Sequence, residues 1–349
     1  MTASASAPAQ LASGTISIRD VANPLQVLSG WRLAITGLWP SQCPPTLQTA
    51  SLEGNDLRID ARSVFDLCPR EPTPFSVELN PALVLQRREL DAGVYRVYFY
   101  AGSGVQAQPQ LLAFALVNRS GADAQRIIPE NGFWWSTGPD RTVLSIERQG
   151  SQLSAALLSY DPAGQPAWLF GTARFDGRVA HIPLLHLSGG AEPFARATTV
   201  PHGDSAMTLD LQFTGAARAN AWLSRPGGDN GALQLRALEM VRLPLAASDN
   251  GAAWLGEWVL VGGKPDATPL RLRFDRFQSL DKRHFELIED ATANALTCVR
   301  DRDASDEPPH ACALHFADGT ITQFDSVAIE RMDGVDANGA AMHLLRVTP

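Results

Sequence analysis

The amino-acid sequence predicts an all-β protein, with an N-terminal β-sandwich followed by a larger antiparallel β-barrel or β-sandwich region. Short apolar runs recur along the whole chain, and each is bounded by Gly, Pro, Asp or Ser, which is typical of strands joined by turns. No window repeats apolar residues at i, i+3 and i+4 over three turns, as an amphipathic helix requires. At 349 residues the chain has room for two or three domains of ordinary size.

Residues 15–117 are predicted to form the sandwich. Alternating apolar and polar residues mark several short strands, of which Gly93–Tyr100 is the strongest. Asp91-Ala92-Gly93-Val94-Tyr95 resembles the Asp-x-Gly-x-Tyr corner of immunoglobulin-like folds, whose tyrosine hydroxyl donates a hydrogen bond to upstream backbone. Antibody-type domains carry a cysteine two residues later, where this chain has Val97. The resemblance implies an Ig-like β-sandwich without the usual inter-sheet disulfide; the alternative is a plain turn before a strand.

A polar connection at residues 118–131 is a plausible boundary before a Trp-rich antiparallel β domain, predicted over 132–244. This region begins with a β-meander, with strands expected at 142–148, 153–160 and 167–173. The meander region carries three of the chain's eight tryptophans. Further strand candidates up to Val241 bring the expected number to seven or eight, which is enough for a barrel or a second sandwich.

The meander also resembles a segment of uncharacterised, exported, β-rich bacterial proteins. Its pattern is GxWW, a Gln-Gly turn, and then Tyr-Asp-x-x-Gly-x-Pro-x-Trp. The matching residues are Gly132, Trp134, Trp135, Gln149, Gly150, Tyr160, Asp161, Gly164, Pro166 and Trp168. In the commoner form an Asn-Pro and an acidic-Gly element follow the second tryptophan, where this chain has Ser136-Thr137-Gly138-Pro139. The resemblance covers about forty residues and implies a β-rich fold and an exported setting, but no activity.

Small residues at 245–251 precede a C-terminal β domain, predicted over 252–349. Gly256-Glu257-Trp258 at its start resembles the opening of lipocalin-like barrels. The segment either forms a domain of its own or completes the barrel of the preceding region, and the sequence leaves both arrangements open.

Composition excludes some classes of protein. The net charge is −8 and the only lysines are Lys264 and Lys282, so no basic patch favours nucleic-acid binding. No apolar run approaches the ~18 residues of a membrane-spanning helix. Residues 1–14 have neither a charged n-region nor an apolar h-region, and are predicted to be either a disordered leader or a mature N-terminus with an added start Met.

The four cysteines fall into two close pairs, Cys43 with Cys68 and Cys298 with Cys312. Their even number and local pairing favour two disulfides in a periplasmic or secreted protein. Four cysteines allow three pairings, and four buried thiols in a cytosolic protein are the alternative.

Trp134, Trp135, Tyr160 and Trp168 are the candidate ligand-binding residues, because flat aromatic faces can stack on the C–H faces of sugar rings. Adjacent Trp134 and Trp135 point to opposite sides of a strand, so at most one can face a given ligand. The alternative is that all four are packing residues, since tryptophan is largely buried on average.

Two groups of residues could hold a metal, but we predict no metal site. Cys298, His310, Cys312 and His315 could bind zinc, although their spacing is not that of a zinc finger and a Cys298–Cys312 disulfide is preferred. A nearby acidic loop could bind calcium but lacks the EF-hand glycine, and is predicted to be a solvated hairpin tip. Its acidic residues are Asp301, Asp303, Asp306 and Glu307. His181 and His186 lie an odd number of residues apart, which puts them on opposite faces of a strand.

No Gly-x-Ser-x-Gly elbow, His-Glu-x-x-His motif, P-loop or dinucleotide-binding glycine motif occurs, so no catalytic residue and no cofactor is predicted. The first hypothesis is a non-catalytic, exported binding protein for cell-envelope glycan or for an envelope protein. One alternative is a carrier of a small apolar ligand inside a lipocalin-like barrel. The other is a hydrolase whose site the sequence does not reveal.

Overall fold

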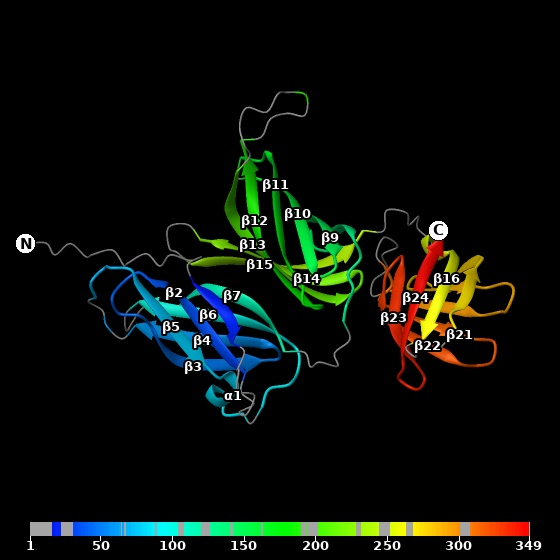
Figure 1. Ribbon diagram of the computed structural model, residues 1–349, viewed down its shortest axis with the longest axis horizontal. Helices are drawn as coiled ribbons and strands as arrows, with labels where there is room; N and C mark the ends of the chain where they lie inside the picture. The colour runs from blue at the N-terminus through cyan, green and yellow to red at the C-terminus, as the bar shows by residue number, and fades with distance from the viewer. Residues whose placement is uncertain are drawn as a thin grey trace, which may run out of the picture. The chain divides into compact units, whose positions relative to one another are not determined.

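The computed structural model describes residues 16–21, 31–63, 65, 68–87, 89–103, 108–119, 126–139, 142–161, 163–189, 194, 202–227, 232–243, 252–262, 268–300 and 308–348. Most of these residues lie in strands (Figure 1), which confirms the all-β class. The helical elements among them are short: α1 (Pro81–Val84) and the 3-10 turn η1 (Ala252–Trp254). The predicted leader at 1–14 lies outside the described residues.

The N-terminal strands form two sheets around one core. The sheets have the orders β1-β2-β5 and β3-β4-β6-β7. Their strands are β1 (Ser17–Val21), β2 (Arg32–Trp39), β3 (Thr46–Glu53), β4 (Asp56–Ser63), β5 (Thr73–Leu79), β6 (Val94–Ser103) and β7 (Gln110–Asn118). Both sheets contribute residues to one hydrophobic cluster, as in a β-sandwich. Trp39, Phe75 and Phe99 are buried in it. The neighbours β4 and β6 run parallel to each other, a pairing that the sequence did not predict.

The tyrosine corner expected of an Ig-like sandwich is present. The Tyr95 hydroxyl donates a hydrogen bond to the backbone oxygen of Asp91 over 2.7 Å. The Tyr95 side chain is buried, and its ring centroid lies 4.9 Å from that of Trp31. Val97, at the position of the antibody cysteine, is also buried in the sandwich core.

The central strands form a closed barrel with the order β10-β11-β12-β13-β14-β15-β8-β9 (green to yellow-green in Figure 1). They are β8 (Gly132–Ser136), β9 (Val143–Gln149), β10 (Gln152–Tyr160), β11 (Pro166–Arg174), β12 (Val179–Ser188), β13 (His202–Gly215), β14 (Arg218–Pro226) and β15 (Leu233–Arg242). The ring closes where β15 pairs with β8 and Arg242 lies opposite Trp134. Trp134 and Phe175 each make an edge contact with Phe213, at centroid distances of 5.6 and 5.4 Å.

The C-terminal strands form a sheet of their own, with the order β17-β16-β24-β23-β22-β21-β20-β19-β18. They are β16 (Gly256–Gly262), β17 (Leu270–Phe274), β18 (Arg276–Ser279), β19 (His284–Ile288), β20 (Ala295–Val299), β21 (Ala311–His315), β22 (Ile321–Val327), β23 (Arg331–Asp336) and β24 (Ala341–Thr348). The two outermost strands, β17 and β18, are separated only by Asp275, so one bent run of chain supplies both edges. The sheet therefore curls round a core that includes Trp254, Trp258 and Phe285.

Both predicted disulfides are present. Cys43 is bonded to Cys68, and Cys298 to Cys312. The second bridge joins directly opposed residues of β20 and β21.

The chain divides into two compact units. Residues 1–125, 178–212 and 221–237 belong to the first unit, and residues 126–177, 213–220 and 238–349 to the second. The barrel contributes strands to both units, while β8, β9, β10 and β11 lie wholly in the second. The domain boundaries expected from the sequence stay a prediction.

Candidate functional site

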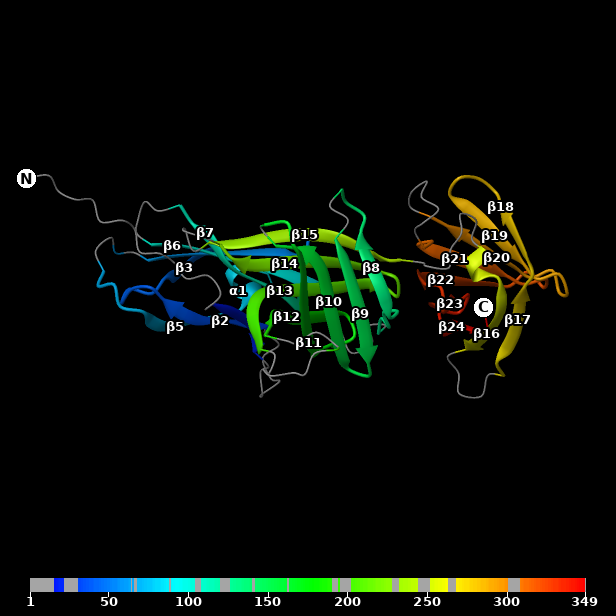
Figure 2. The same ribbon diagram turned by 90° about the horizontal axis from the view of Figure 1, so that it is seen from above.

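Four neighbouring barrel strands, β8 to β11, place apolar side chains in two rows on the outer face of the barrel (strands labelled in Figure 2). The first row of directly opposed residues is Trp135, Val143, Leu158 and Trp168. The second row is Phe133, Ser145, Ala156 and Phe170. Side chains alternate between the two faces of a strand, so both rows lie opposite the buried Trp134, Leu144 and Leu157.

We call the large apolar members of this surface the outer aromatic face. It consists of Phe133, Trp135, Val143, Leu158, Tyr160, Trp168 and Phe170. Tyr160 is 73% exposed and Trp168 is 67% exposed, whereas Trp135 is half-buried. Because tryptophan and tyrosine usually bury most of their surface, such exposure on a strand of a closed barrel calls for an explanation.

The structure separates the four residues that the sequence proposed for ligand binding. Trp134 points into the barrel, is fully buried, and donates from Nε1 to the backbone oxygen of Glu130 over 3.1 Å. Trp135, Tyr160 and Trp168 lie together on the outer aromatic face. The two adjacent tryptophans thus point to opposite sides, as predicted.

Sequence reasoning missed two aromatic members of this face, Phe133 and Phe170. Each lies two residues from a predicted site residue, Trp135 and Trp168 respectively. The period of two along a strand was therefore a signal that could have found both.

Several residues of the GxWW…YDxxGxPxW segment have a structural role. Gly132 has φ +123°, and a Cβ there would lie 2.9 Å from Nη2 of Arg242. Gly150 and Gly164 have φ values of +61° and +77° in the two hairpin turns, which favour glycine. Oδ1 of Asp161 accepts two backbone N–H groups of its own turn, each at 2.8 Å. The fold itself thus accounts for these residues.

Tyr160 and Trp168 have no comparable structural role. Within the described part of the chain, neither side chain makes a hydrogen bond, an ion pair or a contact with another aromatic ring. Neither the barrel interior nor a turn of the described chain uses these two side chains.

Polar residues border the outer aromatic face, and most of them carry hydroxyl groups. The hydroxyl of Ser145 lies within the second row, and the next row of opposed residues is Glu147, Ser154 and Thr172. The first two rows contain no charged side chain. The face therefore changes over about 7 Å, two residues along a strand, from aromatic to hydroxyl-bearing.

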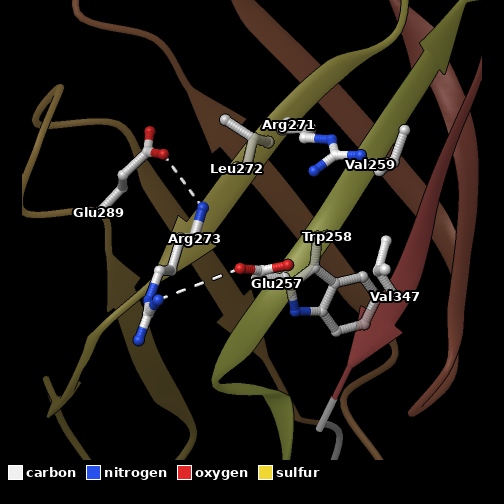
Figure 3. A pocket seen from close by; sticks show the side chains of 8 residues that line it. All are labelled: Glu257, Trp258, Val259, Arg271, Leu272, Arg273, Glu289 and Val347. Atoms are coloured by element: carbon white, nitrogen blue, oxygen red, sulfur yellow. Dashed lines mark hydrogen bonds and ion pairs between the residues drawn. The ribbon is translucent and has the colours of Figure 1, made fainter.

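The C-terminal sheet contains a pocket of about 110 Å³ (Figure 3). It is lined by Glu257, Trp258, Val259, Arg271, Leu272, Arg273, Glu289 and Val347. The backbone N–H of Arg273 donates to Oε1 of Glu289 over 3.0 Å, and Nη1 of Arg273 lies 4.0 Å from Oε1 of Glu257. This pocket has room for only about three or four waters. Side chains such as Trp258, Phe285 and Phe324 fill the core of the sheet, so nothing here favours the carrier alternative.

Three histidines are paired with aspartates, as is the base of a Ser-His-Asp triad. The Nδ1–Oδ pairs are His181–Asp210 at 2.7 Å, His284–Asp281 at 2.8 Å and His343–Asp333 at 2.6 Å. Burial raises the pKa of Asp210, and the hydrogen bond to Asp210 raises the pKa of His181. Among the described residues no serine or threonine hydroxyl bonds to any of the three imidazoles.

The metal hypotheses gain no support. Among the residues that the structure describes, no three His, Cys, Asp or Glu side chains gather as a metal site would require. Cys298 and Cys312 are joined to each other, so neither is a thiolate ligand for zinc. The acidic residues of the calcium hypothesis, Asp301, Asp303, Asp306 and Glu307, lie outside the described residues.

The fold and the site together define an all-β protein with two disulfides and an exposed aromatic surface on a closed barrel. None of the helices in the described ranges has the length and apolar character needed to cross a membrane. No family model, no curated protein and no solved structure matches the chain. The resemblance of the tryptophan segment to exported bacterial proteins stays a prediction.

Proposed function

We propose that the protein is a non-catalytic, exported binding protein whose outer aromatic face holds cell-envelope glycan. The observation that carries this proposal is Trp168, which is 67% exposed on a paired strand and makes no contact that the fold requires. Tyr160 and Phe170, 73% and 43% exposed, flank it on the same face. The apolar C–H face of a sugar ring is positively polarised, so it packs well on the negative face of an aromatic ring.

The polar border supports a glycan over a purely apolar ligand. A sugar ring carries hydroxyl groups beside its apolar face, and a hydroxyl that loses water without gaining a partner is costly. Ser145, Ser154 and Thr172 lie on the same outer face and can donate and accept hydrogen bonds. Aromatic rings beside hydroxyl groups are therefore complementary to the two sides of a sugar.

The disulfides support the exported setting. Structural disulfides form and persist in the periplasm and outside the cell, where cell-envelope glycans are found, and are rare in the cytosol. Both bridges close short loops, of 25 and 14 residues in sequence separation.

Co-sedimentation with insoluble peptidoglycan and with a panel of polysaccharides tests the proposal. The non-reduced protein should bind at least one of them saturably, and Trp168→Ala should abolish that binding while Trp168→Phe retains part of it. Leu270→Ala is a matched control, because Leu270 in β17 is 43% exposed, like Phe170, but lies in the C-terminal sheet. Absence of binding across the panel by the folded protein would refute the proposal.

An envelope protein is the second candidate for the same face. Val143 and Leu158 lie between the two tryptophans of the first row, and such aliphatic side chains pack well against a protein surface. Capture of one partner from an envelope extract, lost in Trp168→Ala and kept in Leu270→Ala, would favour this candidate if no glycan binds.

A further inference from the structure

We infer that the outer aromatic face binds an uncharged polysaccharide from its side, along interior sugar units rather than at a chain end. This inference rests on the proposed function and narrows it to a class of ligand. The spacing of the exposed rings indicates contact with several sugar units. The open surface indicates binding from the side, and the charge indicates an uncharged chain.

The three most exposed rings of the face form a strip. Trp168 and Phe170 lie two residues apart on β11, which separates them by about 7 Å along the strand. Tyr160 pairs with Pro166, so it is a diagonal neighbour of Trp168 across two strands, at about 7–8 Å. The strip is therefore about 14 Å long, which suits several consecutive units of a chain better than a single sugar.

The strip lies on an open surface. Its three side chains, Tyr160, Trp168 and Phe170, are 73%, 67% and 43% exposed. A site for a single sugar or a chain end needs walls on several sides to bury most of the ligand. An open strip contacts only one side of its ligand, so affinity has to come from the number of units in contact.

Charge on the outer face of these four strands does not favour a polyanion. The two rows that hold Trp168 and Phe170 lack charged side chains, and Tyr160 lies opposite the uncharged Pro166. The rows beyond them carry Glu147 and Arg174, one of each sign. Recognition of sulfate, phosphate or carboxylate groups along a chain relies on clustered arginines or lysines, so the ligand is uncharged.

A length series of linear, uncharged oligosaccharides, from one to six units of glucose or N-acetylglucosamine, tests this inference by calorimetry. Affinity should rise with each added unit until the strip is covered and then stay constant. Tyr160→Ala and Phe170→Ala, at the two ends of the strip, should each weaken binding of the longest chains by roughly three- to tenfold. Each should also shorten the chain length at which affinity stops rising, whereas Leu270→Ala should change neither.

The other outcomes are distinguishable. If a monosaccharide binds as tightly as a hexasaccharide and depends on Trp168, side-on binding is overturned while the proposed function stands. Tighter binding of a polyanionic polysaccharide, weakened by salt, would overturn the uncharged class alone. If no glycan binds although Trp168→Ala and the parent protein give the same far-UV circular dichroism, both proposals fail and the protein partner becomes the better candidate.

Discussion

Trp134 and Trp168 sit in the same barrel, so replacing each by alanine tests the assignment of inside and outside directly. Trp134 is fully buried against Phe213 and donates a hydrogen bond from its indole. A buried tryptophan covers about 150–250 Å² of surface, and replacing it by alanine costs about 3–5 kcal/mol. Trp168 is 67% exposed and its opposed neighbour is Leu158. Such a cross-strand contact is worth about 0.2–1 kcal/mol, so Trp168→Ala should cost less than about 1 kcal/mol.

Urea unfolding followed by far-UV circular dichroism measures both costs without relying on the mutated fluorophores. Because a chain with several sheets need not unfold in one step, hydrogen exchange of the amides in β8 to β11 should be measured alongside. Trp134→Ala should speed exchange throughout these strands. Trp168→Ala should leave their exchange unchanged and remove only glycan binding. The assignment of faces would be refuted if both substitutions lowered the free energy of unfolding equally, or if Trp168→Ala lowered it more.

Three further outcomes are expected. Tyr95→Phe removes the hydrogen bond of the tyrosine corner and should lower the free energy of unfolding by about 1 kcal/mol, so an unchanged urea midpoint would contradict this role. Gly132→Ala introduces a Cβ at a strained φ and should cost about 1–3 kcal/mol, whereas Gly138→Ala, with open space around it, should change stability by less than about 0.5 kcal/mol. Backbone N–H groups and His284 lower the pKa of Asp281 from 3.8 to about 2. Since the folded-state pKa is the lower one, this carboxylate stabilises the fold above pH 3.8 and its contribution is lost as the pH falls towards 2. An NMR titration of Asp281 with a midpoint near 4 would contradict that sign.

Local patterns in the sequence were enough for the class of fold and for several of its details. Apolar runs between turn residues indicated strands, and the Asp-x-Gly-x-Tyr pattern led to the corner in which Tyr95 bonds to backbone. The spacing of the cysteines led to the Cys43–Cys68 and Cys298–Cys312 pairs. Each of these features depends on residues close together in the chain, where sequence spacing limits the possible geometry.

The sequence did not predict which distant strands pair with each other. The parallel contact of β4 with β6 and the closure of the barrel by β15 against β8 join segments whose alternation fits many partners equally well. The same limit applied to the candidate site. Alternation put Trp134 and Trp135 on opposite faces, but only the neighbouring strands decide which face is the interior. For that reason the exposure of Trp168 could not be predicted, although its alignment with Trp135 follows from the register.

Closure of the barrel affects how the outer aromatic face can evolve. The strands under the outer aromatic face, β8 to β11, are paired with their neighbours in the ring, so along these pairings their backbone groups are not left to bind a partner by strand addition. Whatever contacts the outer aromatic face must therefore recognise side chains alone. Those side chains make little contribution to the interior, where Trp134 and Phe213 hold the ring together. The specificity of the surface can thus drift one residue at a time, to a different sugar or a different partner, while the scaffold beneath it keeps its stability.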